Sequence, residues 1–409
     1  MTSKPQPRIL VFEPQMNGHH GAYLRWIVRG GIERGCRIRL ATLRQNQTHP
    51  AFLRLLDEYP SDFDATFLPD GAPCREIPAN AIPLLVRDYR WRYFFQRCYR
   101  DEVRNGQEPS LVFIPYLDAC LYSLALTGSP FGQTPWGGIA MRPSFHLRAA
   151  GVHLSRVKEC LFRRLLKDPS LVRLYTIVEP LARHIENTAP RWASRSRYLP
   201  DPAGIPAGIS RAEARRALGI PDSAPLMLVY GAISLRKGVD ALLAAAKQPE
   251  FPADLHLLLA GQQDAGATAL LAGATDHPLV REKRLHVIND YLDETLESQV
   301  FCAADMVWLG YRQHYGSSGV MVQAGHMGLP LIGCEDGLIG WTIRQHGLGI
   351  AVPVQQPGET ARAIATFART PPLRRRCGEA ARHYYASHTP ECFIQRLYEG
   401  LNPCIWSSP

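Results

Sequence analysis

The chain has 409 residues, enough for two or three domains, and its 46% apolar and 20% charged residues exclude wholesale disorder. The formal net charge is +9, with 28 basic and 17 acidic residues in the first 200 positions and 18 and 20 in the remainder. No apolar run approaches about 18 residues and no charged segment precedes a short apolar core, so we expect neither a membrane-spanning helix nor a secretory signal. Ten cysteines without a Cys-x-x-Cys pair predict reduced thiols and a cytoplasmic protein.

Short apolar runs alternate with longer helical patterns along the whole chain. In the first half they predict strands at residues 8–12, 37–42, 65–68, 111–115, 136–141, 174–178 and 196–199. In the second half they predict strands at residues 226–230, 255–260, 285–288, 306–309, 331–333 and 349–352. Near-continuous apolar strands separated by helices indicate parallel sheets that are covered on both faces. The predicted fold class is therefore α/β, with two Rossmann-like parallel sheets.

A break between the two series of strands falls at Pro200–Pro206, where three prolines and a glycine stop any regular element. Ser210 followed by Glu213 predicts a capping box that opens the first helix of the second half. We therefore expect a first domain at residues 1–203 and a second at 204–388. The remaining residues, 389–409, predict a C-terminal helix and tail that cross back to the first domain.

The first candidate binding loop follows the first strand and contains Gly18, His19 and Gly21. Glycines between a strand and a helix permit a tight turn, and the free N–H groups at the start of a helix favour an anion. A Gly-x-Gly-x-x-Gly fingerprint is absent. The alternative interpretation is a plain turn with solvated histidines.

The second candidate loop carries the adjacent cations Arg236 and Lys237 between a buried strand and an amphipathic helix. Such a pair suits a diphosphate, because Arg offers a bidentate fork and Lys a point charge. The alternative is that both side chains are simply solvated.

The third candidate is the run Gly316, Ser317, Ser318 and Gly319, which has the character of a helix start whose amides and hydroxyls point at one anion. It does not match the Gly-x-Ser-x-Gly turn of hydrolases. Gln323 lies about one turn further on, where it could reach a ribose, or could be an ordinary surface residue of the helix.

The order of these motifs resembles the donor-binding domain of GT-B glycosyltransferases, of the family 4 type. The matching features are Gly231, Lys237-Gly238, Leu258–Gly261, Ala303–Asp305, Gln323-Ala324, Gly328–Ile332, Gly337–Gly340 and Gly347–Ile350. The resemblance covers residues 200–370 and is looser in the first half. It implies two domains facing each other across a cleft, a nucleotide-diphospho-sugar donor, retention of anomeric configuration, and no metal or other cofactor.

Three positions depart from the pattern of that family. Its usual Arg five residues before the Lys is Ala232 here, and its Glu-x7-Glu pair is Tyr315 and Gln323. A glutamine can bind a diol but brings no charge. Arg236 and the serine-rich run could compensate by binding phosphate.

The resemblance extends to further candidates. Asp118, Arg142 and His146 follow strands of the first half, where acceptor-domain loops of this fold approach the sugar, and Glu179 is placed similarly. Ile288 and Tyr291 would meet the base. Each of these has a structural alternative, such as an N-cap for Asp118.

Asp62-Phe63-Asp64 has the form of a metal-binding Asp-x-Asp, but it lies in the wrong architecture, so no metal site is predicted. The stretch Tyr89–Arg100 interleaves basic and aromatic residues. A second basic helix contains Arg156, Lys158, Arg163, Arg164 and Lys167. The first stretch is typical of membrane-surface helices, which would hold the protein at the inner face of a membrane. It is also typical of single-strand nucleic-acid surfaces, and the alternative for these stretches is a packed helix edged with arginine.

The sequence therefore predicts a metal-independent glycosyltransferase of glycan, lipid-linked saccharide or glycoconjugate biosynthesis. Its partners would be a nucleotide sugar, a saccharide, lipid-linked or small-molecule acceptor and an anionic membrane surface, with no nucleic acid. Arg236, Lys237, Asp118, Arg142 and His146 are the catalytic candidates. Two alternatives remain, which are a non-catalytic binding subunit of the same fold and a sugar-nucleotide epimerase.

Overall fold

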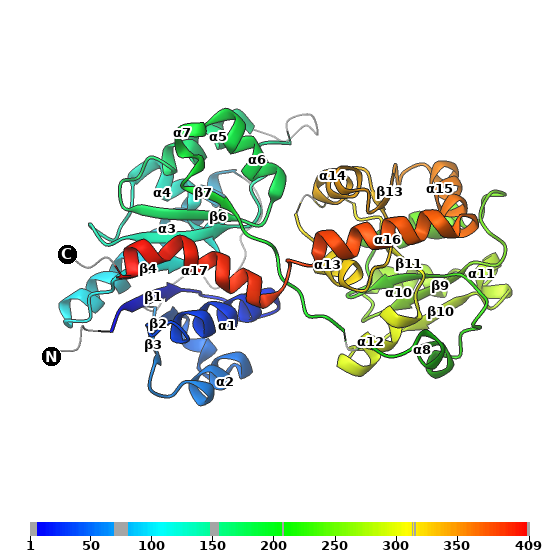
Figure 1. The fold of residues 1–409 in the computed structure, drawn as a ribbon, viewed down its shortest axis with the longest axis horizontal. Helices are drawn as coiled ribbons and strands as arrows, with labels where there is room; N and C mark the ends of the chain where they lie inside the picture. The colour runs from blue at the N-terminus through cyan, green and yellow to red at the C-terminus, as the bar shows by residue number, and fades with distance from the viewer. Residues whose placement is uncertain are drawn as a thin grey trace. The chain divides into compact units, whose positions relative to one another are not determined.

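The computed structural model describes residues 6–68, 81–147, 155–206, 208–312, 314 and 316–406. The chain forms two units, of which the first comprises residues 1–200 and 390–409 and the second comprises residues 201–389. Figure 1 shows the C-terminal helix, drawn in red, lying among the blue and green elements of the first unit. Within the described residues, no helix has the length and apolar character needed to span a membrane.

The described part of the first unit contains a seven-stranded parallel sheet. Its strands are β1 (Arg8–Phe12), β2 (Arg37–Thr42), β3 (Phe63–Phe67), β4 (Leu111–Ile114), β5 (Trp136–Ala140), β6 (Leu171–Thr176) and β7 (Ser196–Tyr198). They lie in the order β3-β2-β1-β4-β5-β6-β7. The helices are α1 (His19–Ile32), α2 (Pro50–Glu58), α3 (Ala81–Arg104), α4 (Leu121–Thr127), α5 (Ser155–Leu165), α6 (Glu179–Thr188), α7 (Pro190–Ala193) and α17 (Pro390–Trp406).

The core of the first unit is built on the apolar strands. Phe12 of β1 is buried and its ring stacks on Phe95 of α3, with ring centroids 4.4 Å apart. Fully burying such side chains contributes roughly 1.5–3 kcal/mol each, so the sheet and its helices are held together chiefly by apolar contact.

Helix α17 is anchored to the first unit although it follows the second unit in sequence. The hydroxyl of Tyr398 donates to the carbonyl of Ile27 in α1 at 2.6 Å, and the hydroxyl of Tyr175 in β6 donates to the carbonyl of Leu397. A Cβ at Gly30 of α1 would lie 2.5 Å from a carbon of Ile394, so glycine permits this close approach.

The second unit contains a six-stranded parallel sheet in the described residues, in the order β10-β9-β8-β11-β12-β13. Its strands are β8 (Leu226–Tyr230), β9 (His256–Ala260), β10 (Leu285–Ile288), β11 (Met306–Leu309), β12 (Leu331–Cys334) and β13 (Gly349–Val352). The helices are α8 (Arg211–Leu218), α9 (Val239–Ala245), α10 (Ala265–Ala272), α11 (Pro278–Arg281), α12 (Glu294–Ala303), α13 (Gly319–His326), α14 (Gly337–His346), α15 (Pro357–Arg369) and α16 (Pro371–Tyr385).

The predicted strands are confirmed, since each apolar run overlaps one of the observed strands. The largest shift is in β6, which begins at Leu171 because that residue pairs with Trp136 of β5. The capping box is also confirmed, since the Ser210 hydroxyl accepts from the backbone of Glu213 and the Glu213 carboxylate accepts from the backbone of Ser210.

Candidate functional site

In each sheet, the strand order reverses between two neighbouring strands, so the connections that follow these two strands run in opposite directions. In the first unit this reversal lies between β1 and β4, and in the second between β8 and β11. Loops diverge at the carboxyl ends of such strands, which leaves a crevice where α/β proteins bind ligands. Several of the candidate side chains lie at these two places, and the others lie elsewhere in the two units.

In the second unit, the loop after β8 forms a short 3₁₀ turn, Leu235–Lys237, ahead of α9. The Lys237 side chain is buried and its ammonium group donates to the carbonyl of Tyr230, the last residue of β8. Burial, with Arg236 adjacent, lowers the pKa of Lys237 to about 8. Lys237 Nζ also lies 5.4 Å from the ring centroid of Tyr311, which follows β11.

Glycine fixes the position of this loop. Gly238 has φ of +70°, and a Cβ there would lie 2.2 Å from the carbonyl oxygen of Gly310, after β11. The Trp308 indole donates to the carbonyl of Lys237 at 3.0 Å, and the backbone N–H of Arg312 donates to the carbonyl of Arg236 at 2.8 Å. The loops after β8 and β11 are therefore joined through their backbones.

Arg236 is exposed and belongs to a chain of polar contacts across these loops. Its guanidinium donates to His314 Nδ1 at 3.3 Å, and His314 Nε2 lies 3.0 Å from the carbonyl of Ser317. Since the carbonyl can only accept, Nε2 carries the proton and Nδ1 accepts from arginine. Arg236 also lies over the Tyr311 ring, 5.7 Å from its centroid.

The serine-rich run leads into α13, as expected. Ser318 is the N-cap residue and makes no side-chain cap, because its hydroxyl is directed to the hydroxyl of Tyr311 at 3.4 Å. Gly319 begins the helix, and Gly316 and Ser317 precede it. The structure therefore brings this helix start beside Arg236 and Lys237. Tyr315 lies outside the described residues.

Gln323 of α13 has a partner that the sequence analysis missed. Its amide donates to Oε1 of Glu297, in α12, at 2.7 Å, and the Tyr230 hydroxyl donates to the same oxygen. Burial and this carboxylate raise the pKa of Tyr230. Nothing in the spacing of Glu297 marks it, because α12 and α13 are separated by β11 and its loop.

The two candidates for base binding occupy the end of β10 and the loop beyond it. Ile288 is half-buried as the last strand residue, whereas Tyr291 is 77% exposed. Asn289 between them accepts from the backbone of Gln263, which ties this loop to the one after β9. Tyr291 therefore presents its ring to solvent at the carboxyl edge of the sheet.

In the first unit, Gly18 precedes α1 with φ of +59°, and His19 is the first helical residue. Burial, together with His20 and Arg142, lowers the pKa of His19 to about 4, so this ring is neutral near pH 7. A Cβ at Gly21 would lie 2.7 Å from the carbonyl oxygen of Met16, so the glycine lets the β1–α1 loop close against the helix.

Asp118 lies in a 3₁₀ turn after β4 and its carboxylate is occupied by the backbone. It accepts from the N–H groups of Met141 at 2.7 Å and Arg142 at 3.0 Å, so it braces the loop after β5. Arg142 is exposed, and its guanidinium lies over the ring of Tyr116, 5.5 Å from the centroid. Asp118 and Arg142 thus meet at the crevice between β1 and β4.

His146 and Glu179 lie apart from this group. Burial lowers the pKa of His146 to about 4, and neither ring nitrogen hydrogen-bonds to any described residue. Glu179 begins α6 and pairs with Arg183 at 2.6 Å. In the Asp-x-Asp sequence, Asp64 lies in β3 and pairs with Arg39 at 2.8 Å.

The basic–aromatic stretch lies within α3, and its two faces differ. The side chains of Trp91, Phe94, Phe95, Cys98 and Tyr99 are buried in the core. The opposite face exposes apolar Leu85, Val86, Tyr89 and Tyr93, and basic Arg90, Arg97 and Arg100. A hollow of about 780 Å³ lies along this face. Arg92 instead donates to the carbonyl of Gly128 after α4.

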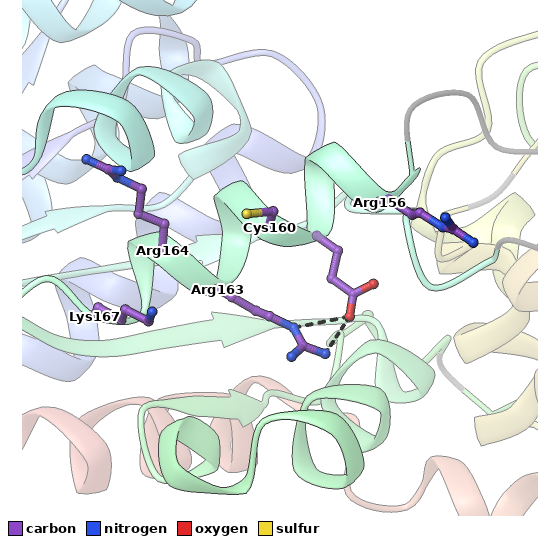
Figure 2. Close-up of a pocket in the computed structure, with 6 residues that line it drawn as sticks. Arg156, Cys160, Arg163, Arg164 and Lys167 are labelled. Carbon is purple, nitrogen blue, oxygen red and sulfur yellow. Dashed lines mark hydrogen bonds and ion pairs between the residues drawn. The ribbon is translucent and has the colours of Figure 1, made fainter.

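The second basic helix is α5, which packs on α4, as α3 does. Figure 2 shows Arg163 turned toward the carboxylate of Glu159, which it contacts at 2.6 Å, while Arg156 and Arg164 point away from it. A cavity of about 490 Å³ runs along these residues. Arg156 and Arg164 thus give α5 a cationic face, and Lys167 lies just beyond the end of the helix.

Comparison with known proteins finds a family match within the second unit. Residues 210–384 match the family of glycosyl transferases group 1. A curated relative, the D-inositol 3-phosphate glycosyltransferase of Streptomyces bingchenggensis (strain BCW-1), is 27% identical over 189 residues. That alignment spans 42% of this chain and 39% of the relative.

Solved structures match nearly the whole chain. Sucrose-phosphate synthase from Thermosynechococcus elongatus is 18% identical with a TM-score of 0.68, and the match covers 98% of this chain and all of that one. HepE from Anabaena, solved in complex with UDP, is 13% identical with a TM-score of 0.67, covering 97% and 99%. The two parallel sheets with interleaved helices are those of the GT-B fold, so the predicted fold class is confirmed.

Proposed function

We propose that the protein transfers a sugar from a nucleotide-diphospho-sugar to an acceptor, because residues 210–384 match the family of glycosyl transferases group 1. The observation that carries the proposal is the meeting of Arg236 and Lys237 with the start of α13 between β8 and β11. HepE, of the same fold, was solved with UDP and with UDP-glucose, which supports a nucleotide sugar as the donor.

The chemical task is to stabilise the diphosphate as it leaves with the bonding electron pair. Preorganised cations and helix-start N–H groups do this without a metal ion. In the proposal, Arg236 and Lys237 bind the diphosphate with Gly316, Ser317, Ser318 and Gly319. Lys237 would exchange its bond to the Tyr230 carbonyl for one to phosphate, which restores its full charge.

In the proposal, the ribose and the base of the donor are bound by residues at the carboxyl edge of the same sheet. Gln323 and Glu297 would bind the ribose hydroxyls, and Ile288 and Tyr291 would meet the base. Gly18, His19, Asp118, Arg142 and His146 belong to the unit that would receive the acceptor. Retention of configuration is carried over from the family resemblance.

We place the acceptor at an anionic membrane surface, on account of α3 and α5. Tyr89 and Tyr93 would enter the interface while Arg90, Arg97 and the α5 cations meet lipid headgroups. This would hold the protein at the inner face of the membrane and suits a lipid-linked acceptor. The mixture of exposed apolar and basic side chains supports a lipid surface over a nucleic acid.

The test is a thermal-shift panel of nucleoside diphosphates and nucleotide sugars, followed by transfer assays with the donor that binds. A ligand at 100 times its Kd should stabilise the protein by about 2.7 kcal/mol. Activity is expected to survive EDTA, and the anomer of the product reports the stereochemistry. Binding without transfer or hydrolysis would instead identify a non-catalytic subunit, which the replacements Tyr315 and Gln323 make the main alternative.

A further inference from the structure

A polar hollow of about 430 Å³ lies in the first unit, between the last two strands of its sheet and the C-terminal helix. Helix α17 packs against β6 (Figure 1). The hollow is lined by Arg173 of β6, Arg197 of β7 and Arg396 of α17. Guanidinium groups from three elements of the fold thus border one space, although α17 follows the whole second unit in sequence.

The strands direct two of these arginines to the side of the sheet that α17 covers. Arg173 and Tyr175 are two positions apart along β6 and so point to the same face, and Tyr175 is in register with Arg197 of β7. The Tyr175 hydroxyl donates to the carbonyl of Leu397 in α17, which identifies the covered face. Burial raises the pKa of Tyr175, and the charges of Arg173 and Arg197 oppose that rise, so both cations lie close to the hydroxyl.

Helix α17 supplies the other wall of the hollow. Arg396, Glu399 and Gly400 share one face of this helix, because residues three and four positions apart are neighbours on its surface. Gly400 leaves the hollow open, since a Cβ there would lie 3.2 Å from Nε of Arg173. The Gly400 carbonyl accepts from Nε and Nη2 of Arg173 at 3.4 and 3.5 Å, which holds this guanidinium against the helix.

The hollow keeps an excess of positive charge. The one carboxylate among its described lining residues, Glu399, accepts from Gln395 at 2.8 Å. Within the described part of the chain, none of the three arginines forms an ion pair. A concave surface lined by one sign of charge concentrates ions of the other sign, and guanidinium groups match the oxygens of phosphate. The unpaired arginines therefore indicate an anionic ligand.

We propose that this hollow binds a phosphate monoester, with Arg173 and Arg197 of the sheet and Arg396 of α17 around the phosphate. The inference does not depend on the proposed function. A phosphate monoester offers three acceptor oxygens and nearly two negative charges to the three guanidinium groups, whereas a carboxylate offers two oxygens and one charge. The hollow also exceeds the roughly 300 Å³ at which small-molecule pockets begin, so it has room for the organic part of the ligand. Such a ligand joins the sheet to α17.

The experiment is calorimetry at low salt with glycerol 3-phosphate as the probe and glycerol as its uncharged counterpart. Wild type should bind the first and not the second. Arg197→Gln and Arg396→Gln should each weaken binding of glycerol 3-phosphate about tenfold or more, the effect of losing one charge-assisted hydrogen bond. Both side chains are exposed, so neither substitution should prevent folding. Arg173 is left intact because it supports the carbonyl of Gly400.

A matched control replaces Arg37 and Arg54 with Gln, because both are exposed elsewhere in the same unit, and this variant should bind glycerol 3-phosphate normally. Hydrogen exchange supplies a second measurement. Because the ligand contacts both the sheet and Arg396, backbone amides of α17 should exchange more slowly when the probe is bound. Unchanged exchange in α17 with the probe bound would exclude Arg396 from the site and overturn the proposal in this form.

Vesicles of phosphatidylcholine with and without phosphatidic acid present the same phosphate group on a lipid. Binding of free glycerol 3-phosphate that depends on Arg197 and Arg396 identifies a soluble ligand, and dependence seen with phosphatidic acid vesicles alone identifies a lipid headgroup. The proposal is wrong if wild type binds neither probe, or if both arginine variants bind the probes as tightly as wild type. It is also wrong if Arg236→Ala abolishes binding of glycerol 3-phosphate while the two variants retain it, since the binding then belongs to the loop after β8.

Discussion

The amide of Gln323 donates a hydrogen bond to the carboxylate of Glu297 at 2.7 Å, although the two residues belong to different helices. The negative charge that Gln323 lacks is therefore supplied beside it by α12. Tyr230 contacts the same carboxylate oxygen, so the group is held from two sides.

We expect Glu297→Gln to weaken binding of nucleoside diphosphates about tenfold, the effect of losing one charge-assisted hydrogen bond to a ribose hydroxyl. Calorimetry with the preferred nucleotide and with its 2′,3′-dideoxy analogue measures this. The wild type should discriminate between the two, and the variant should not. Glu294→Gln, on the exposed first turn of α12, is the control and should discriminate normally. Undiminished discrimination by Glu297→Gln would exclude a ribose contact.

Arg236→Ala and Lys237→Ala should each lower turnover roughly 10²-fold or more, the scale of losing one preorganised donor to developing negative charge. Initial rates at saturating donor provide the measurement. Lys247→Ala, beyond α9, is the control substitution of a cation. Wild-type turnover in both variants would refute the assignment of this loop to the diphosphate.

The pKa of Lys237, lowered to about 8 from 10.5, predicts a pH dependence of stability. Between those values the unfolded chain binds the proton more strongly, so this group makes the free energy of unfolding rise with pH across that window. The difference between wild type and Lys237→Met, followed by denaturant titration at pH 7 and pH 10, isolates the contribution. Nucleotide affinity should fall above pH 8, because a bound diphosphate favours the charged lysine. Identical pH profiles of unfolding free energy for the two proteins would contradict the first expectation, and identical pH profiles of nucleotide affinity would contradict the second.

Gly238→Ala should destabilise the second unit by more than the roughly 1–3 kcal/mol that a strained backbone costs, because its Cβ would also meet the Gly310 carbonyl at 2.2 Å. Gly219→Ala is the matched control, since Gly219 has φ of +65° with open space around its Cβ position. Urea denaturation of both variants measures the difference. Equal losses of stability in the two variants would mean that the loops after β8 and β11 can move apart to accommodate the added methyl group.

Replacing Arg90, Arg97 and Arg100 of α3 with Ser should weaken binding to anionic vesicles, since each cation near such a surface contributes about 1 kcal/mol. Co-sedimentation at two salt concentrations is the measurement, and higher salt should reduce binding by screening. Arg92 is left intact because it supports the carbonyl of Gly128. The control replaces three exposed arginines elsewhere in the unit, namely Arg37, Arg54 and Arg191. Equal, negligible binding of wild type to anionic and neutral vesicles would make the α3 face a solvated surface.

Local sequence was sufficient to predict the strands, the capping box at Ser210 and the final helix. Each depends on neighbouring residues: a short apolar run between turn-forming residues favours a buried strand, and a capping box is closed within four positions. Local sequence also predicted that Arg236, Lys237 and the serine-rich run follow the ends of strands. The parallel order of the strands then brought these loops together.

Tertiary structure alone decided which partner each side chain meets. Sequence spacing could not show that Lys237 turns inward to the Tyr230 carbonyl, that Asp118 is used by the loop after β5, or that Glu297 lies against Gln323. Nor could spacing show that Nδ1 of His20, at the start of α1, lies 3.2 Å from Oε1 of Glu13, just beyond β1. Secondary structure follows from periodic short-range preferences. Hydrogen-bond partners and burial instead depend on packing between elements that are distant in sequence, and local sequence patterns do not specify that packing.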